Sequence, residues 1–92
     1  MSDKAAKKKI RVVLVDDHTL VRDALIRLLE SDKDIQVVAG GGTAAEAQSL
    51  VEKHKPDVLI MDIELPDQNG LVAGRDLLLE NPKLNVIFLT MH

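Results

Sequence analysis

The stretch Val12-Val13-Leu14-Val15-Asp16-Asp17 is the most informative part of the sequence, because four aliphatic residues in a row are followed by two carboxylates. Two later stretches follow the same plan: Val58-Leu59-Ile60-Met61 ends in Asp62, and Val86-Ile87-Phe88-Leu89 ends in Thr90. Short β-branched runs without alternation are typical of strands that are buried on both faces of a parallel sheet. Neighbouring strands lie ~4.8 Å apart, and open α/β sheets place their sites at the carboxyl ends of the strands. We therefore expect the three carboxylates and the hydroxyl to share one pocket.

The sequence between these stretches alternates between helical and strand patterns. We expect strands at residues 10–15, 35–39, 58–62 and 85–89, and helices at residues 19–31, 43–55 and 71–80. Thr43-Ala44-Ala45-Glu46 is a capping-box signature at the start of the second helix. In the first helix, apolar residues at helical spacing are expected to face the sheet, with Arg22 on the other side: Val21, Ala24, Leu25, Leu28 and Leu29. Strands that alternate with helices predict an α/β fold, a doubly wound parallel sheet with helices on both faces.

Composition places the chain among small globular proteins and excludes several classes. Its 92 residues are enough for one domain, 46% of them are hydrophobic, and the net charge is −3. Without cysteine there is no disulfide or thiolate chemistry, and without a basic face this segment is not expected to bind nucleic acid. No apolar run is long enough to span a membrane, so no membrane partner is expected and a cytoplasmic location is compatible. Residues 1–9 are expected to be a flexible polar leader.

The residues after Asp62 complete an ordered pattern. Pro66 and Gly70 lie four and eight residues beyond it, in a loop before the third helix. Together with the acidic pair and the final threonine, this arrangement resembles the receiver domain of two-component response regulators. Residues 15–22 (VDDHTLVR) resemble the NarL/FixJ (LuxR-type) transcriptional subfamily in particular. The resemblance covers nearly the whole chain from Ile10 and implies a flavodoxin-like (CheY-like) fold, with four of its strands and three of its helices present.

The resemblance assigns roles to the residues of the expected pocket. Asp62 would be the phosphoacceptor for a histidine kinase, since a carboxylate can attack a phosphoryl group and form an acyl phosphate. Asp17 and Asp62 would ligate Mg²⁺ directly, the backbone carbonyl of Glu64 would be a third ligand, and Asp16 would act through a metal-bound water. Mg²⁺ prefers such oxygen donors, and clustered carboxylates repel one another in the absence of a cation. The protein would be a phosphorylation switch that controls transcription, and not an enzyme beyond its own phosphorylation and dephosphorylation.

The resemblance also implies roles at the end of the last strand. Thr90 would hydrogen-bond the phosphoryl group and report its presence, and the bulky Met91 would restrict access to it. A receiver normally carries a phosphate-binding lysine on a fifth strand, which lies between a fourth and a fifth helix. No lysine follows Lys83, so no residue of this sequence can be assigned that role.

We therefore expect residues 10–92 to form a receiver domain that lacks its last helix, strand and helix. No DNA-binding domain is expected, so DNA would be reached only through an absent effector domain. The strand at residues 85–89 would be an apolar edge with unpaired backbone groups. We expect such an edge to pair with a second copy, either edge to edge or by exchange of elements.

Other interpretations stay open from the sequence. The chain could be an interaction or dimerisation module that uses no phosphoryl chemistry. A metal-dependent hydrolase of the phosphoaspartate type is less favoured, because its second acid usually lies two residues after its nucleophile, whereas Asp16 and Asp17 are adjacent. Asp17 could also be an ordinary cap of the helix that begins near Thr19. The three histidines show no metal-ligand spacing: His18, His54 and His92.

Overall fold

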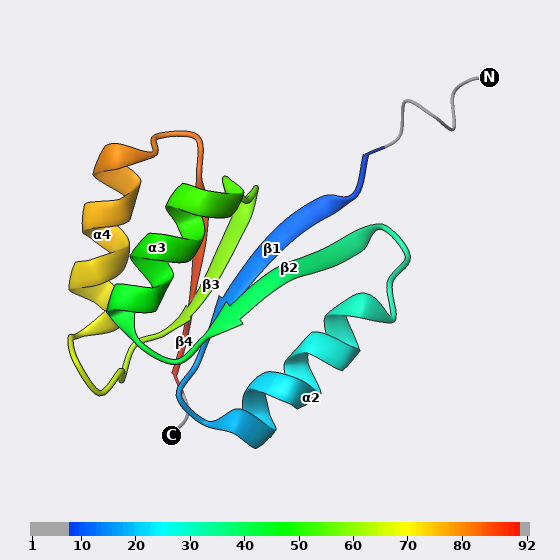
Figure 1. Cartoon of the computed structure of the whole chain (residues 1–92), viewed down its shortest axis with the longest axis horizontal. Coiled ribbons are helices and arrows are strands. Elements are labelled where there is room, and N and C mark those ends of the chain that lie inside the picture. Colours follow the sequence, from blue (N-terminus) through cyan, green and yellow to red (C-terminus); the bar gives the residue numbers. More distant parts are fainter. Residues whose placement is uncertain (1–7, 91–92) are drawn as a thin grey trace.

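The structure is a computed structural model that describes residues 8–90 (Figure 1). Met91, for which a role in site access is predicted, and the first seven residues of the predicted leader lie outside the described residues. The elements along the chain are β1 (Ile10–Val15), α2 (Thr19–Glu30), β2 (Ile35–Gly41), α3 (Ala44–His54), β3 (Val58–Asp62), α4 (Gly70–Glu80) and β4 (Asn85–Leu89). Within the described range, no helix has both the length and the apolar character that crossing a membrane requires.

The four strands form one parallel sheet in the order β2-β1-β3-β4. Helix α2 lies against one face of the sheet, and α3 and α4 lie against the other (Figure 1). The predicted fold, a doubly wound parallel sheet, is therefore confirmed. The chain passes from β1 to β2 in one direction and then returns to form β3 on the other side of β1. Open α/β sheets bind ligands at such a switch point, beyond the carboxyl ends of the strands.

The register of the strands brings the predicted site residues to the same edge. The last residue of β1 lies beside Met61 of β3, and Asp62 lies beside Leu89 of β4. The residues that follow β1 and β4, Asp16 and Thr90, therefore leave the sheet close to the level of Asp62.

The central strands are buried on both faces, as their apolar runs predicted. The core under α3 and α4 combines alternate strand residues with small and aliphatic helix residues, chiefly Val13, Val15, Leu59, Met61, Ala47, Val51, Ala73 and Leu77. Val12 and Leu14, which point to the face that carries α2, are equally buried. Each fully buried aliphatic side chain contributes about 1.5–3 kcal/mol. The core thus holds in place the two strands whose ends carry the carboxylates.

Helix α2 faces the sheet differently from the predicted pattern. Ala24 and Leu28 are exposed, whereas Ile26 and Arg22 are partly buried, so the predicted outward position of Arg22 is wrong. The reason is a hydrogen bond: Arg22 Nη1 donates to the backbone carbonyl of Asp16 at 2.9 Å, which turns the side chain toward the sheet. A methyl group on Gly40 of β2 would lie 3.5 Å from Arg22 Cδ and 3.6 Å from Ile26 Cδ1, so both residues lie over this glycine at ordinary contact distance.

The bounds of four elements differ from the predictions: α2 ends one residue earlier, α3 is one residue shorter at each end, β2 is longer and α4 begins earlier. Strand β2 continues through Gly41, because glycine keeps both backbone hydrogen-bonding groups and the Gly41 carbonyl accepts a hydrogen bond from the Asp16 backbone N–H at 2.9 Å. Helix α4 begins at Gly70, one residue early. Asn69 is its N-cap, since the side-chain oxygen accepts a hydrogen bond from the backbone N–H two residues later at 2.8 Å.

Candidate functional site

The structure brings the predicted acidic residues together at the carboxyl edge of the sheet. Asp16 and Asp62 are buried, with 0% and 2% of their surface accessible, and Asp17 is exposed. One carboxylate oxygen from each of the three and one ring nitrogen of His18 all lie within 4.8 Å of one another. Asp17 does not cap α2, because the N-cap of that helix is His18. The arrangement is a compact acidic cluster with one imidazole.

Each buried carboxylate of this cluster has one satisfied oxygen and one unsatisfied oxygen. Asp16 Oδ1 accepts a hydrogen bond from the backbone N–H of His18 at 2.8 Å, and Asp62 Oδ1 accepts one from the backbone N–H of Glu64 at 2.9 Å. Asp16 Oδ2 and Asp62 Oδ2 are buried and have no hydrogen-bond partner. An unsatisfied buried polar group costs about 1–3 kcal/mol, and more when it is charged. A hard divalent cation that binds oxygen ligands would remove this cost, so the donor set fits Mg²⁺.

His18 lies closer to the carboxylates than the sequence indicated. Its Nδ1 atom is 3.1 Å from Asp16 Oδ1, 3.1 Å from Asp17 Oδ1 and 4.0 Å from Asp62 Oδ2. The hydrogen bond to Asp16 and the negative charge of Asp17 raise the pKa of the imidazole above its ordinary value of 6.5. The sequence places His18 beside the expected pocket, but the histidines lack metal-ligand spacing and no role is assigned to it. Its position directly after the acidic pair was the available signal.

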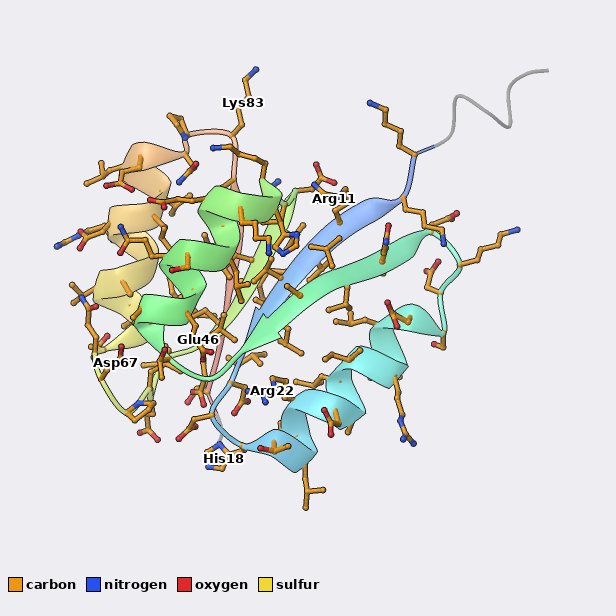
Figure 2. The ribbon with its side chains drawn as sticks, viewed as in Figure 1. Arg11, His18, Arg22, Glu46, Asp67 and Lys83 are labelled. Carbon is orange, nitrogen blue, oxygen red and sulfur yellow. The ribbon has the colours of Figure 1, made fainter. Side chains whose placement is uncertain are left out.

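Arg22 is a second residue of the site that the sequence did not reveal. One turn into α2, its Nη1 donates a hydrogen bond to the backbone carbonyl of Asp16 at 2.9 Å. The guanidinium therefore ties the first turn of α2 to the loop that carries the acidic pair (Figure 2). Its helical position four residues after His18 was the only local signal, because the contact depends on how α2 packs.

The loop between β3 and α4 holds the predicted residues Glu64, Pro66 and Gly70. It begins with the hydrogen bond from Glu64 to Asp62, and it closes where the Gly70 N–H donates to the Ile63 carbonyl at 2.7 Å. Pro66 is exposed in the middle of the loop. The loop thus returns to the end of β3 before α4 starts, and the metal-ligand role of the Glu64 carbonyl stays a prediction.

Asp67 anchors the same loop to a different helix. Its two oxygens accept hydrogen bonds from the backbone N–H groups of Ala44 at 2.8 Å and Ala45 at 3.1 Å, in the first turn of α3 (Figure 2). The hydrogen bond from Ala44 is the main cause that lowers the pKa of Asp67 below its ordinary value of 3.8. No spacing in the sequence links residues so far apart.

The last strand places Thr90 next to the end of β3. The carbonyl of Leu89 accepts a hydrogen bond from the Ile63 N–H at 3.0 Å, so Thr90 follows at the point where the chain leaves Asp62. Thr90 is exposed, and its role in binding a phosphoryl group stays a prediction.

The described lysines do not reach this edge. Each of them lies shortly before a strand, at the amino end of the sheet: Lys8, Lys9, Lys33, Lys53, Lys55 and Lys83. Figure 2 shows Lys83 at the end of the molecule opposite His18. Within residues 8–90, the cation that contacts the backbone of the acidic loop is the guanidinium of Arg22.

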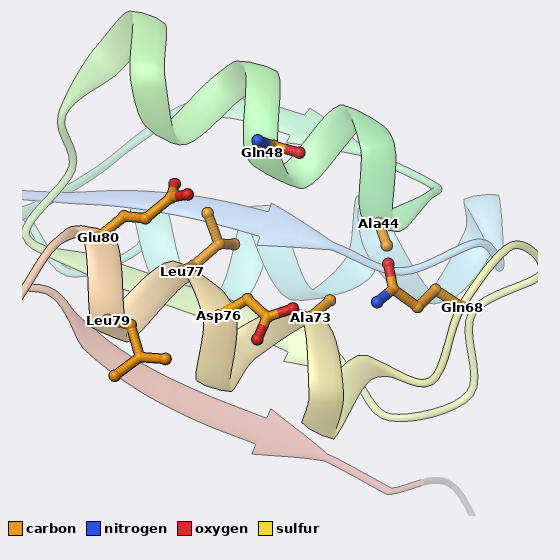
Figure 3. Close-up of a pocket in the computed structure, with 8 residues that line it drawn as sticks. All are labelled: Ala44, Gln48, Gln68, Ala73, Asp76, Leu77, Leu79 and Glu80. Atoms are coloured by element: carbon orange, nitrogen blue, oxygen red, sulfur yellow. The ribbon is translucent and has the colours of Figure 1, made fainter.

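A groove between α3 and α4 is another candidate pocket (Figure 3). Its walls include Gln48, Asp76, Leu77 and Glu80. Its two carboxylates are on the exposed side of α4, and no histidine, lysine or arginine lines it. It therefore offers less chemistry than the acidic cluster, which we take as the functional site.

The sheet order and the buried carboxylates at its switch point define a flavodoxin-like domain with an acidic site. The family described as "Response regulator receiver domain" matches residues 12–92, and the chain belongs to this family. It is 40% identical to the transcriptional regulatory protein DegU of Brevibacillus brevis over 92 residues, which are 100% of this chain and 39% of that protein. The chain thus spans about two fifths of the length of this curated relative.

Solved structures show the same likeness. A LuxR-family two-component response regulator from Aurantimonas sp. SI85-9A1 superposes with a TM-score of 0.87 at 35% identity, covering 92% of this chain and 61% of that one. The isolated receiver domain of RcsB from Salmonella enterica serovar Typhimurium superposes with a TM-score of 0.86 at 25% identity, covering 92% of this chain and 64% of that one. The predicted receiver fold and the likeness to NarL and LuxR-type regulators are confirmed.

Proposed function

We propose that Asp62 accepts a phosphoryl group from a phosphohistidine of a histidine kinase. In this step a carboxylate oxygen of Asp62 attacks phosphorus, the phosphorus–nitrogen bond to the kinase breaks, and an acyl phosphate forms. The observation that carries the proposal is Asp62 Oδ2, which is buried, lacks a hydrogen-bond partner and belongs to the cluster of carboxylates. The RcsB receiver structure was determined with the phosphomimetic BeF3⁻, which supports the same chemistry for a related domain.

The residues that would hold Mg²⁺ are Asp17, Asp62 and the backbone carbonyl of Glu64, with Asp16 acting through a bound water. When bound, the cation would neutralise the charge that collects on the phosphoryl oxygens. Asp62 is held for this role by the hydrogen bond between its Oδ1 and the Glu64 N–H, which leaves Oδ2 without a hydrogen-bond partner.

Two neighbouring residues would hydrogen-bond the phosphoryl group and limit the access of water to it. The Thr90 hydroxyl, at the end of β4, would donate a hydrogen bond to a phosphoryl oxygen and so couple β4 to the state of Asp62. Met91 would restrict access of water. If Met91→Ala leaves the lifetime of the acyl phosphate unchanged, the role of Met91 is withdrawn.

For the whole protein we propose that this switch controls transcription. The support is the similarity to DegU, a transcriptional regulatory protein, and to the LuxR-family response regulator from Aurantimonas. DNA would be bound by an effector domain, with the histidine kinase as the partner of the receiver in the cytoplasm. The receiver would carry no catalysis beyond its own phosphorylation and dephosphorylation.

Incubation with acetyl phosphate and Mg²⁺, followed by intact-mass measurement, tests the proposal. We expect one phosphate-sized adduct, which is lost in Asp62→Asn. It should persist in Asp76→Asn, because Asp76 is an exposed carboxylate of α4 and serves as a matched control. An unmodified wild-type chain, or an adduct that survives Asp62→Asn, would contradict the assignment.

A second candidate function is an interaction module that dimerises without phosphoryl chemistry. The observation in its favour is β4, which pairs with β3 alone among the described strands, with 51% of Ile87 accessible. We propose that this edge contacts a second copy of the chain. A chain that dimerises but forms no adduct would favour this function over the first.

A further inference from the structure

His18 adds a nitrogen donor to a cluster that otherwise offers only oxygen. Its Nδ1 lies 3.1 Å from one oxygen of Asp16 and 3.1 Å from one oxygen of Asp17. The third carboxylate oxygen, Asp62 Oδ2, is 4.0 Å from the same nitrogen, and it is buried without a hydrogen-bond partner. The nitrogen is thus in contact with the cluster, and an unsatisfied buried oxygen belongs to the same group.

The 3.1 Å separation from Asp16 Oδ1 is a hydrogen bond in this structure, and all three separations also lie in the range of donors that share one metal ion. With donors at about 2.1 Å from an octahedral cation, adjacent donors are separated by roughly 3.0 Å and opposite donors by roughly 4.2 Å. The two 3.1 Å separations and the 4.0 Å separation from Nδ1 fall close to these values. The side chain of His18 is 60% accessible, so an ion in solvent can reach the imidazole.

The donor atom determines which metal ions the imidazole binds more tightly. Mg²⁺ binds carboxylate, carbonyl and water oxygens, whereas imidazole suits later first-row ions such as Ni²⁺ and Zn²⁺. For a given set of nitrogen and oxygen donors, affinity rises from Mn²⁺ through Co²⁺ to Ni²⁺ and Cu²⁺. An imidazole at this place therefore changes the selectivity of the site more than it changes Mg²⁺ binding.

We propose that His18 Nδ1 is a direct ligand of this site for first-row transition-metal dications, with the carboxylates of Asp16, Asp17 and Asp62 as the oxygen donors. The chain would then bind Ni²⁺ and Co²⁺ more tightly than Mg²⁺, and His18 would supply the difference. The inference rests on the metal site of the proposed function and adds a ligand and a class of ion to it.

His18 also has a structural role, which the test must separate from ligation. Its backbone N–H donates to Asp16 Oδ1, and it is the N-cap residue of α2, although its side chain makes no capping hydrogen bond. A side chain that only positioned Asp16 would affect every ion that the carboxylates bind. A nitrogen ligand affects Ni²⁺ selectively.

The experiment is calorimetric titration of the untagged chain with NiCl₂ and, separately, with MgCl₂, at one pH. We expect His18→Ala and His18→Asn to weaken Ni²⁺ binding about tenfold or more, since loss of even an outer-shell partner costs 10- to 100-fold. Mg²⁺ binding should change by less than about twofold in the same variants. His54→Ala is the matched control, because His54 ends α3 at the opposite edge of the sheet, and it should leave both titrations unchanged.

A second measurement needs no variant. NMR spectra of the wild-type chain with Co²⁺ should show strongly shifted ring-proton signals from His18 and ordinary signals from His54. Equal losses of Ni²⁺ and Mg²⁺ affinity in the His18 variants, or unshifted His18 ring signals with Co²⁺ bound, would overturn the inference. Loss of the phosphate adduct with Ni²⁺ selectivity intact would instead count against the phosphoacceptor proposal alone.

Discussion

For the two buried carboxylates, the features that lower the stability of the fold are the ones that favour binding of a cation. Burial under a well-packed core favours neutral, satisfied groups, yet Asp16 Oδ2 and Asp62 Oδ2 have no hydrogen-bond partner. Removing a charge from water without a partner is costly, and two neighbouring carboxylates add repulsion to that cost. The same unsatisfied oxygens give the site its affinity for a cation. Stability without metal and affinity for metal should therefore change in opposite directions.

Asp16→Asn tests this opposition directly. The new amide keeps the oxygen that accepts a hydrogen bond from the His18 N–H, and it replaces a charged oxygen near Asp62 by an N–H donor. We therefore expect the free energy of unfolding without metal to rise by about 1–3 kcal/mol. Addition of Mg²⁺ should stabilise the wild-type chain and have little effect on the variant. Urea unfolding in EDTA and in Mg²⁺ measures both effects. Asp23→Asn, at an exposed position of α2, is the control, and a less stable Asp16→Asn chain would refute the argument.

Among the elements, the loop between β3 and α4 is fixed by hydrogen bonds at two places, its end and its middle. Gly70 closes it against the end of β3, and Asp67 fastens its middle to α3. The loop starts from the proposed phosphoacceptor, so its geometry is part of the site.

Gly70→Ala should distort this loop. A methyl group there would run into the carbonyl oxygen of Asp62 and lie 2.8 Å from Ile63 Cα, and both of these are backbone atoms that cannot rotate away. We expect a loss of about 1–3 kcal/mol in the free energy of unfolding, the usual cost of overpacking, together with weaker Mg²⁺ binding. Urea unfolding and metal titration measure the two effects. Gly42→Ala meets looser contacts, mainly an Arg22 side-chain atom, and should cost less; equal effects would contradict the steric explanation.

Asp67→Ala should destabilise the chain in a pH-dependent way. The pKa of Asp67 is lowered in the folded state, so the ionised carboxylate stabilises the fold above its ordinary pKa of 3.8, and this contribution is lost as the pH falls through the lower folded-state value. The variant should therefore unfold more easily than wild type at neutral pH, and the difference should shrink in acid. Urea unfolding at several pH values checks this, and a difference that stays constant into acid would show that the anchor does not depend on charge.

These elements show where prediction from the sequence succeeded and where it stopped. The buried strands, the strand ends and the helix cap at Thr43 follow from local patterns, and the Thr43 hydroxyl does accept from the Glu46 N–H at 3.0 Å. The contacts of Arg22, His18 and Asp67 depend on how α2, β1 and the loop before α4 pack against one another. A helical pattern of apolar residues cannot show that an arginine turns inward to hydrogen-bond the backbone carbonyl of Asp16. The acidic core of the site could therefore be predicted, whereas the residues that hold and tune it could not.

At the scale of the whole molecule, the two faces of the sheet are covered unequally. Helices α3 and α4 cover one face, whereas α2 alone lies on the other, over β1 and β2 (Figure 1). Val86 and Phe88 of β4 point toward the first face and pack against its core. Ile87 points to the second face, where 51% of it is accessible. Within residues 8–90, β4 also pairs on one side only, so it presents apolar surface and free backbone groups together.

We expect this edge to make the chain self-associate, and Ile87→Lys to weaken the association. A charge on an edge strand opposes pairing with a second copy, because the ammonium group would have to be desolvated at the contact. Sedimentation velocity over a range of protein concentrations measures the effect. Leu20→Lys is the matched control, since Leu20 is 85% accessible on α2 and the substitution adds the same charge away from β4. A chain that stays monomeric at every concentration would refute the edge as a contact surface. If both substitutions weaken association equally, general charge repulsion and not the edge of β4 explains the effect.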